Sequence, residues 1–114
     1  MVIRNTIKKY EIIRGKKEIQ RAFESGFKKA GTFITVFYLK GKTRKIGFTV
    51  SKKYKKAIDR NRAKRIMKEI YRTNKEYFSS GVWLIYCKYF ETIPAYSDMK
   101  DDILQIVQKI KVNE

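Results

Sequence analysis

Apolar residues recur at helical spacing in several segments of the chain, and between them they gather into short runs typical of strands. The first helical segment is Lys16–Ser25, where apolar residues fall at i, i+3 and i+4: Ile19, Ala22 and Phe23. Gly26 follows at the place of a C-terminal cap. A helix this short is marginal alone, so we expect it to dock on the rest of the chain. Residues 1 to 15 are basic and mixed, and they predict mostly irregular structure.

Two apolar stretches then predict a pair of strands. Thr32–Leu39 is rich in aromatic and β-branched residues, and Ile46–Ser51 follows it. The polar connection Lys40–Lys45 is short enough for a hairpin, so we expect the two strands to pair antiparallel. Gly47, inside the second strand, predicts a bulge or a close backbone approach.

A second helical segment runs from Arg62 onward, with apolar residues at i, i+3, i+4 and i+7: Ala63, Ile66, Met67 and Ile70. This stripe is expected to face the core. Asn74–Gly81 is rich in polar and helix-breaking residues and predicts a loop. Val82–Tyr89 is apolar on both faces, which is typical of a central strand.

The chain closes with a third helical segment, after a turn at Pro94. Ser97 is expected as its N-cap, with Asp98 and Asp101 in the first turn, where the helix dipole favours acidic side chains. Its apolar stripe is Ile103, Ile106, Val107 and Ile110.

The predicted order is therefore helix, strand, strand, helix, strand, helix. This order indicates an α+β fold, a two-layer sandwich in which helices pack on one face of a small mixed sheet. The 114 residues show no linker or internal repeat, so residues 1–114 are expected to form a single domain.

The amino-acid composition excludes several kinds of catalytic and metal-binding site. The chain has no histidine, which removes the commonest general base and metal ligand. Its single cysteine, Cys87, is expected to be a small buried hydrophobe, and no disulfide or zinc finger can form. The longest apolar stretch, Val82–Tyr86, is far shorter than the roughly 20 residues that span a bilayer, and the N-terminus does not resemble a signal peptide. We therefore expect a cytoplasmic protein with no membrane partner.

The distribution of charge suggests a function for the second helical segment. The chain holds 28 Lys and Arg against 11 Asp and Glu, and its net charge of +17 points to nucleic acid as the partner. From Lys40 to Arg65 there are twelve basic residues and one acidic residue, Asp59. Solvated helix faces usually mix both signs, so we favour phosphate binding over simple solvation. The residues expected to contact nucleic-acid phosphates are Lys52, Lys53, Arg60, Asn61, Arg62, Lys64, Arg65 and Lys68.

The aromatic strand Thr32–Leu39 leaves two interpretations open. Large apolar groups on both of its faces fit a strand that is buried on both sides. They also fit a sheet that keeps aromatic rings exposed on one face, where unstacked bases can lie.

The segment VSKKYKKAIDRNRAKRIMKEIYR resembles the signature of the bacterial ribonuclease P protein subunit. In that family a strand ends in S-K-K, and A-V-x-R-N-R-x-K-R opens a helix after a short loop. The matching residues are Ser51, Lys52, Lys53, Ala57, Arg60, Asn61, Arg62, Lys64 and Arg65, with Ile58 for the usual valine. The order of the other elements is similar over most of the chain. The chain differs from the usual pattern of the family at two positions: Lys55 stands where a glycine is usual, and Ile19 stands where an aromatic residue is usual.

The resemblance implies a small α–β sandwich related to a ribosomal-protein domain, with a left-handed βαβ crossover. It also implies a protein that joins a catalytic RNA, which removes the 5′ leader from precursor tRNA. The RNA is expected to hold the catalytic Mg²⁺ ions and to perform the hydrolysis. The expected partners are thus the catalytic RNA and precursor tRNA; no protein partner is required and no cofactor is bound by the chain itself.

The resemblance further implies a cleft for the single-stranded leader, between the first helix and an aromatic face of the sheet. Phe23 and Phe37 match family positions there, with Ile19 beside them. Stacking on aromatic side chains stabilises binding by roughly 1–3 kcal/mol per base and tolerates any base. Burial in the core is the alternative for Phe23, because the same helical spacing describes a buried stripe.

No residues indicate that the chain itself is a nuclease. Such an enzyme would need clustered carboxylates to hold two metal ions. The cluster Asp98, Asp101 and Asp102 is explained by the charge preference of a helix N-terminus. The alternative function is a small ribosomal or other structural RNA-binding protein. A membrane-surface protein is disfavoured because the apolar side of the basic helix is expected in the core.

Overall fold

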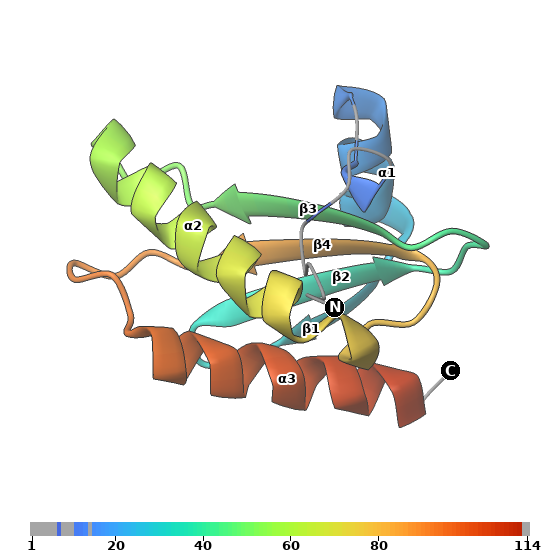
Figure 1. Ribbon diagram of the computed structural model, residues 1–114. Helices are drawn as coiled ribbons and strands as arrows, with labels where there is room; N and C mark the ends of the chain where they lie inside the picture. Colours follow the sequence, from blue (N-terminus) through green and yellow to red (C-terminus); the bar gives the residue numbers. More distant parts are fainter. Residues whose placement is uncertain (1–6, 8–10, 14, 113–114) are drawn as a thin grey trace.

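A four-stranded sheet with the strand order β1-β2-β4-β3 forms the centre of the protein, in a computed structural model that describes residues 7, 11–13 and 15–112 (Figure 1). The strands span Phe27–Ala30 (β1), Ile34–Leu39 (β2), Lys45–Val50 (β3) and Val82–Cys87 (β4). β2 pairs antiparallel with β1 and with β4, whereas β3 runs parallel to β4. The sheet is therefore mixed, and the prediction of a central strand at β4 is confirmed.

The predicted pairing of β2 with β3 is wrong. β4 lies between these strands and bonds to both, so β2 and β3 run in opposite directions without being neighbours. A short connection favours adjacent strands, but β4 carries large apolar groups on both faces. Trp83, Leu84 and Ile85 are fully buried, which requires a strand on each side of β4 and cover on each face.

Strand β1 was not predicted, because the sequence FKKA lacks an apolar alternation and its side chains are largely exposed. It forms a tight hairpin with β2, and Asp102 from the last helix stabilises the turn. The Asp102 carboxylate accepts hydrogen bonds from the backbone N–H groups of Thr32, Phe33 and Ile34, at 3.2, 2.9 and 2.8 Å. A Cβ at Gly31 would lie 2.3 Å from Asp102 Oδ1, so only glycine leaves room for this carboxylate.

The role of Asp102 differs from the one predicted, since its carboxylate accepts hydrogen bonds from the β1–β2 turn and does not act only on the dipole of its own helix.

Asp102→Ala is expected to destabilise the protein by about 2–4 kcal/mol, because partly buried N–H groups lose a charged acceptor. Urea unfolding measures this loss. Asp101→Ala, at an exposed neighbouring position, should change stability by less than about 0.5 kcal/mol; equal losses in the two variants would contradict the assignment.

The helices match the predicted segments with shifted starts. α1 spans Lys16–Ser25, as predicted, α2 spans Ala57–Thr73, and α3 spans Tyr96–Val112. α2 thus begins before Arg62, and Ser97 lies within the first turn of α3 rather than at its N-cap. The predicted loop between α2 and β4 contains a short 3-10 turn, η2, at Lys75–Tyr77.

α2 and α3 pack together on one face of the sheet and enclose the main core. The predicted apolar stripes are confirmed. In α2, Ala63, Met67 and Ile70 are fully buried and Ile66 is partly buried against the core. In α3, the buried residues are Ile103, Ile106, Val107 and Ile110. Alternate residues of β2 and β4 fill this core from the sheet side, including Val36, Trp83 and Ile85.

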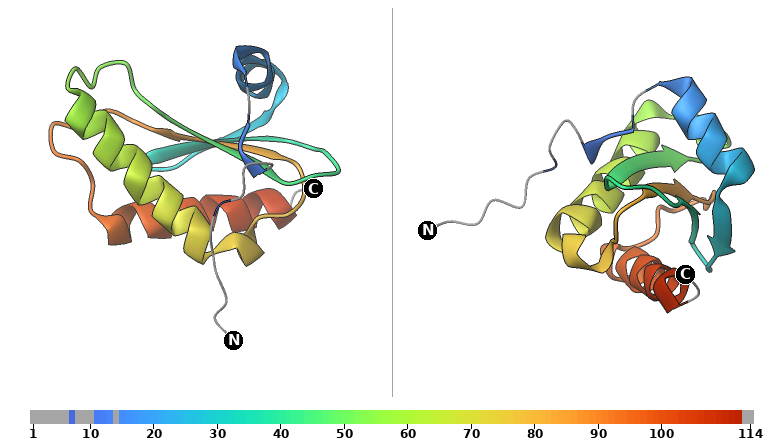
Figure 2. Two further views of the ribbon diagram at one scale, coloured as in Figure 1. Left: turned by 45° about the horizontal axis from the view of Figure 1, so that its top comes forward. Right: turned by 90° about the vertical axis from the view of Figure 1, so that its right-hand side faces the viewer.

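α1 lies on the opposite face of the sheet (Figure 2). The prediction that helices pack on one face therefore holds for α2 and α3, whereas α1 covers a second, smaller cluster. That cluster contains Ala22 of α1 with Phe37, Leu84 and Ile13. It exists because β2 and β4 are apolar on both faces, and the structure thus confirms that β2 is buried on both sides.

The described part of the N-terminal region is more ordered than its sequence predicts. Ile12 bridges to Ile46 in parallel, and the Ile13 N–H donates to the Ile46 carbonyl at 2.9 Å. The prediction of a bulge or a close backbone approach at Gly47 is wrong: the pairing register is unbroken there. Side chains approach Gly47 instead, since an added Cβ would lie 2.9 Å from the Ile13 Cδ1 atom. Residues 1–6, 8–10 and 14 of the segment predicted to be irregular lie outside the described residues.

Candidate RNA-binding groove

The outer side of α2 carries a row of exposed basic residues. Asn61, Arg62, Arg65 and Lys68 are all exposed on it. None of the ion pairs found within the described ranges involves these three cations. Their charges are therefore available to an external polyanion, and their fixed spacing on one helix suits a phosphate backbone.

Arg60 is held differently from its neighbours. Its Nη1 donates to the carbonyl oxygens of Tyr54 and Lys55, both at 2.9 Å, so the guanidinium closes the loop between β3 and α2. Lys55 itself is unstrained, because no non-glycine residue in the described ranges has a positive φ. Lysine at this position is therefore compatible with the loop, and the direct phosphate contact predicted for Arg60 stays a prediction.

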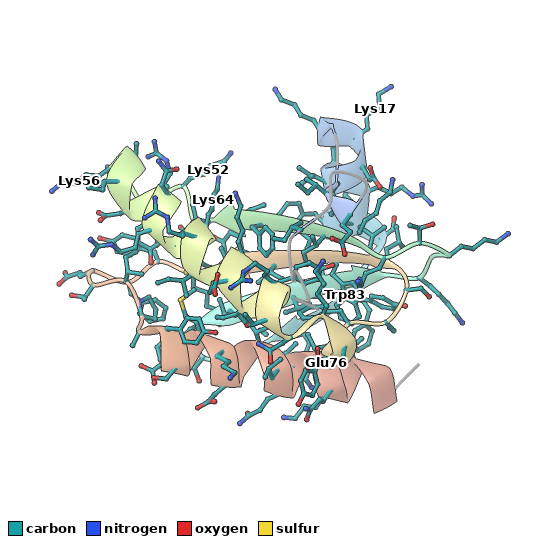
Figure 3. All side chains as sticks on the ribbon, viewed as in Figure 1. Lys17, Lys52, Lys56, Lys64, Glu76 and Trp83 are labelled. Carbon is teal, nitrogen blue, oxygen red and sulfur yellow. The ribbon has the colours of Figure 1, made fainter. Side chains whose placement is uncertain are left out.

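Tyr54 fixes the same loop through its hydroxyl group. Its hydroxyl donates to the Lys88 carbonyl at 2.9 Å and accepts from the Phe90 N–H at 3.0 Å. The loop after β3 is thereby tied to the end of β4. Lys52 and Lys53 are exposed on this loop, and Figure 3 shows Lys52 beside the start of α2.

The variant Tyr54→Phe is expected to reduce the sensitivity of the protein to alkaline pH. Burial raises the pKa of Tyr54 from 10.0 to about 12. A phenol whose pKa is higher in the folded than in the unfolded chain stabilises the fold below the unfolded pKa, and this contribution disappears as pH rises from about 10 to about 12. Urea unfolding at about pH 8 and about pH 11 should show a smaller loss for Tyr54→Phe than for the wild type; equal losses would contradict the assignment.

A groove of about 490 Å³ joins the basic helix to α1. Ile19 of α1 lines one side, and Lys64 and Arg60 of α2 line the other. The remaining lining residues come from the end of β3 and the loop after it: Phe48, Thr49, Val50, Ser51, Lys52 and Tyr54. The groove therefore brings together residues from both predicted sites, one apolar and one basic.

The outer edge of β3 adds backbone groups to this groove. The N–H groups of Lys45 and Ser51 donate towards the two ends of β4, whereas the Ile46 carbonyl accepts on the outer side of the strand. Since successive residues of a strand alternate in direction, Phe48 and Val50 present their N–H and C=O groups outwards, where both residues line the groove. The groove thus offers hydrogen-bond donors and acceptors besides its cations.

A second hollow of about 240 Å³ lies beyond α1, lined by Phe23, Lys28, Thr35, Phe37 and Tyr86. The rings of Phe23 and Phe37 meet edge to face, with centroids 4.7 Å apart. Lys28 Nζ lies 5.9 Å from the Phe37 ring centroid. This hollow combines aromatic rings with a cation, a combination suited to an unpaired nucleotide.

The two phenylalanines differ in exposure, and this difference separates core from surface. Phe37 is only 8% exposed and packs with Ala22 and Leu84, so it belongs mainly to the core. Phe23 is 39% exposed, although its ring packs against that of Phe37. Burial in the core, the alternative that the sequence left open for Phe23, is therefore wrong, and its contact with the leader stays a prediction.

Four residues of this face were not predicted from the sequence. Thr35, Tyr86 and Thr49 lie side by side across β2, β4 and β3 in the pairing register. They connect the two hollows, because Tyr86 lines one and Thr49 the other. Lys28 lines the second hollow from β1, where it lies opposite Phe37 rather than Thr35. The strand order was needed to find this row, since no local pattern in the sequence links the three strands.

Within the described part of the chain, no group of three or more His, Cys, Asp or Glu residues lies close enough to hold a metal ion. The Asp102 carboxylate is engaged by backbone N–H groups, as described above. No helix among the described residues is long and apolar enough to cross a membrane.

Comparison with known proteins shows which family the chain resembles. A family model described as ribonuclease P matches residues 2–111. The ribonuclease P protein component of Petrotoga mobilis is 32% identical, covering 93% of this chain and 96% of the relative. That of Natranaerobius thermophilus is 30% identical, covering 90% and 93%.

Solved structures with the same fold belong to proteins of similar description. The RNase P protein of Staphylococcus aureus superposes with a TM-score of 0.78 at 19% identity, covering 90% of this chain and 96% of that one. The RNase P protein from Thermotoga maritima gives 0.72 at 21% identity, covering 87% and 96%. At these identities the structural match establishes the fold.

Proposed function

The chain belongs to the ribonuclease P family, and from this premise we propose that it binds the catalytic RNA through the outer face of α2 and the 5′ leader of precursor tRNA along the groove beside α1. It is the protein component of a ribonucleoprotein endoribonuclease that acts in tRNA 5′ processing and associates with the ribonuclease P RNA. The family match favours this function over a ribosomal or other structural RNA-binding protein.

The groove between Ile19 and Lys64 is the observation that carries the proposal. Its basic wall continues into the exposed face of α2, which is shaped to follow phosphates of a folded RNA. Its apolar side continues past Ile19 to the exposed ring of Phe23, which suits unstacked bases. A single strand that enters beside α2 can therefore remain in contact with the protein up to α1.

We assign Lys52, Lys53, Asn61, Arg62, Lys64, Arg65 and Lys68 to the catalytic RNA, with Arg60 holding the loop between them. Ile19, Phe23 and Phe37 are assigned to the leader, with Phe37 supporting Phe23 from the core. Stacking and phosphate contacts tolerate any base, and an enzyme that processes many precursors needs that tolerance.

The protein's part in the reaction is to bind and orient RNA. We propose that the catalytic Mg²⁺ ions are held by the RNA, where they supply the charge neutralisation and the activated water of phosphodiester hydrolysis. By placing positive charge beside both RNAs, the chain lowers the repulsion between them and reduces the ion concentration that cleavage requires. We place this activity in the cytoplasm.

Reconstituted cleavage tests the proposal. The catalytic RNA, with and without the purified chain, is given labelled precursor tRNA over a series of Mg²⁺ concentrations. We expect the chain to shift cleavage to lower Mg²⁺ and to accelerate it most for precursors that carry a leader of several nucleotides. A chain that binds the RNA but leaves both the Mg²⁺ requirement and the leader dependence unchanged would overturn the proposed function.

A further inference from the structure

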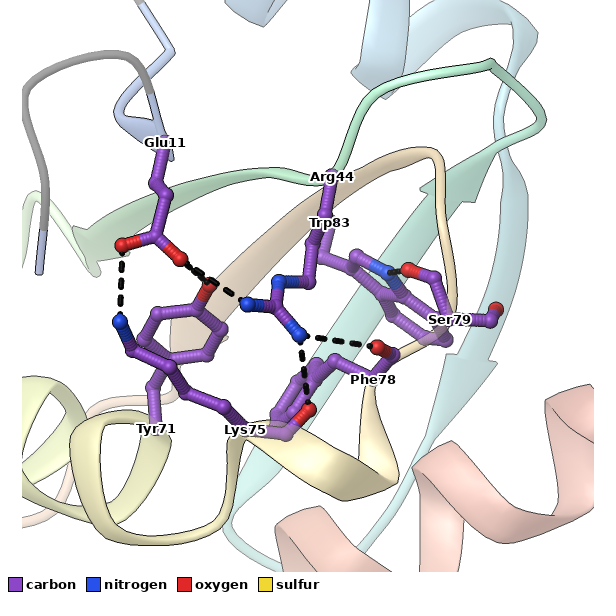
Figure 4. Close-up of polar contacts among 7 residues, drawn as sticks. All are labelled: Glu11, Arg44, Tyr71, Lys75, Phe78, Ser79 and Trp83. Atoms are coloured by element: carbon purple, nitrogen blue, oxygen red, sulfur yellow. Dashed lines mark hydrogen bonds and ion pairs between the residues drawn. The ribbon is translucent and has the colours of Figure 1, made fainter. Parts of the chain in front are cut away.

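One buried carboxylate fastens the N-terminal segment to the body of the protein (Figure 4). Glu11 is only 3% exposed. Its Oε1 accepts from Arg44 Nη2 and from the Tyr71 hydroxyl, both at 3.0 Å, and its Oε2 accepts from Lys75 Nζ at 2.9 Å. Residues far apart in the sequence, from the β2–β3 loop, α2 and η2, thus converge on a single side chain of the N-terminal segment.

The cations around Glu11 are themselves held in place. Arg44 Nη1 donates to the carbonyl oxygens of Lys75 and Phe78, at 3.1 and 3.5 Å. Arg44 and Lys75 also lie over the Tyr71 ring, 5.8 and 5.7 Å from its centroid. Without the Glu11 carboxylate, two partly buried positive charges would face each other, an arrangement that strongly opposes attachment of the segment.

This fastening lies directly before α1. Ile13 bonds to β3, Gly15 turns the chain with a φ of 82°, and α1 begins at Lys16. Among the described residues, the one buried side chain of α1, Ala22, and the ring contact of Phe23 with Phe37 both lie in the second half of the helix. The ion pair between Glu18 and Lys45, at 3.3 Å, is partly exposed and adds little. The position of the start of α1 therefore depends on the attachment of Glu11–Ile13.

The start of α1, which this attachment positions, forms the apolar wall of the groove through Ile19. Ile12, Ile13 and Ile19 line a hollow of about 360 Å³ next to it, together with Lys64 and Lys68 of α2. Ile19 lines both hollows. A shift of the N-terminal segment would thus change the distance between the apolar wall on α1 and the basic wall on α2.

We propose that Glu11 is a positioning residue for the leader: its buried contacts with Arg44, Tyr71 and Lys75 hold α1 at the spacing from α2 that lets one strand of RNA touch both walls. The inference rests on the proposed function of the groove. A purely stabilising role would affect all elements alike, whereas a positioning role affects α1 and leader binding while the α2 surface keeps its affinity for the catalytic RNA.

The test compares Glu11→Gln with Glu76→Gln in the full-length chain. Both variants remove one carboxylate, but Glu76 is exposed and lies outside the cluster. We expect Glu11→Gln to reduce the ratio of holoenzyme affinities for precursor and mature tRNA by about tenfold, because misplaced binding groups lose much of their effect. Its affinity for the catalytic RNA should stay within about twofold of the wild type, and Glu76→Gln should change neither quantity.

Amide hydrogen exchange of the free protein gives a second readout. In Glu11→Gln, exchange should accelerate in residues 11–25 and stay unchanged in β2, β4 and α3. Accelerated exchange throughout the fold, or an unchanged affinity ratio where the wild type discriminates, would overturn the inference. A wild type without leader discrimination would instead refute the proposed function, and exchange in α1 would still decide whether Glu11 holds that helix.

Tyr71→Phe provides a milder variant, because it removes only the hydroxyl that bonds to Glu11. It is expected to change the affinity ratio and the exchange of α1 in the same direction as Glu11→Gln, by a smaller factor. If Glu11→Gln fails to fold, this variant decides: unchanged exchange in α1 and an unchanged ratio would overturn the inference.

Discussion

Replacing Arg62 and Arg65 together by alanine is expected to weaken binding of the catalytic RNA by roughly tenfold or more near physiological salt, because two charge-assisted contacts to phosphate are lost. Both side chains are exposed on α2 and support no part of the fold. Each phosphate contact contributes about 0.7–0.9 to the slope of log K against log salt. The slope should therefore fall by about 1.4–1.8 units, which fluorescence or filter binding over a salt series measures.

The matched control is the pair Lys100→Ala and Lys109→Ala on α3, which also removes two positive charges from the surface. If binding depends on the α2 face, this control should leave the slope almost unchanged. If binding depends only on the net charge of +17, both double variants should lower the slope equally, and the assignment of the RNA surface to α2 would be wrong.

Phe23→Ala is expected to have the largest effect on substrate recognition. Loss of one stacked base costs roughly 1–3 kcal/mol, which corresponds to about a 5- to 150-fold weaker binding of precursor tRNA. Mature tRNA, which lacks the leader, should bind the holoenzyme almost as before. Phe37→Ala should also weaken precursor binding more than mature tRNA binding, but part of its effect will come from a cavity beside Ala22 and Leu84, since Phe37 lies mainly in the core.

Phe27→Ala is the control for Phe23→Ala. Phe27 is 49% exposed and lies opposite Tyr38 in the register, hence on the other face of the sheet from Phe37. It should leave the binding of both tRNA forms unchanged. Equal losses for precursor and mature tRNA in Phe23→Ala would show that Phe23 supports the fold rather than the leader.

Local patterns in the sequence predicted the parts of the site that lie on one element. The apolar stripe of α2 fixes which side of that helix faces the core, so the exposed positions of Arg62, Arg65 and Lys68 follow from helical spacing alone. The S-K-K segment likewise lies at the end of β3, as its resemblance to the family implies. Only the start of α2 was missed, because the first turn, from Ala57, carries no buried residue.

The resemblance implied a cleft beside the first helix, but the groove that brings Ile19 together with Lys64 was not predicted, because it depends on the order of strands. A short loop suggested that β2 and β3 are neighbours, and burial of β4 between them overrode this local preference. Only the true order aligns Tyr86 with Thr35 and Thr49 and places β3 at the edge of the sheet. The contacts of Glu11 could not be predicted either, since its partners Arg44, Tyr71 and Lys75 lie more than thirty residues away in the sequence.

Site-specific photocrosslinking tests the division into two RNA surfaces most directly. A photoreactive phenylalanine derivative replaces Phe23 in one variant and Lys68 in another, and each holoenzyme is irradiated with precursor tRNA. We expect the group at position 23 to crosslink to leader nucleotides and the group at position 68 to crosslink to the catalytic RNA. Crosslinks from position 23 to the catalytic RNA alone, or from position 68 to the leader alone, would contradict the account.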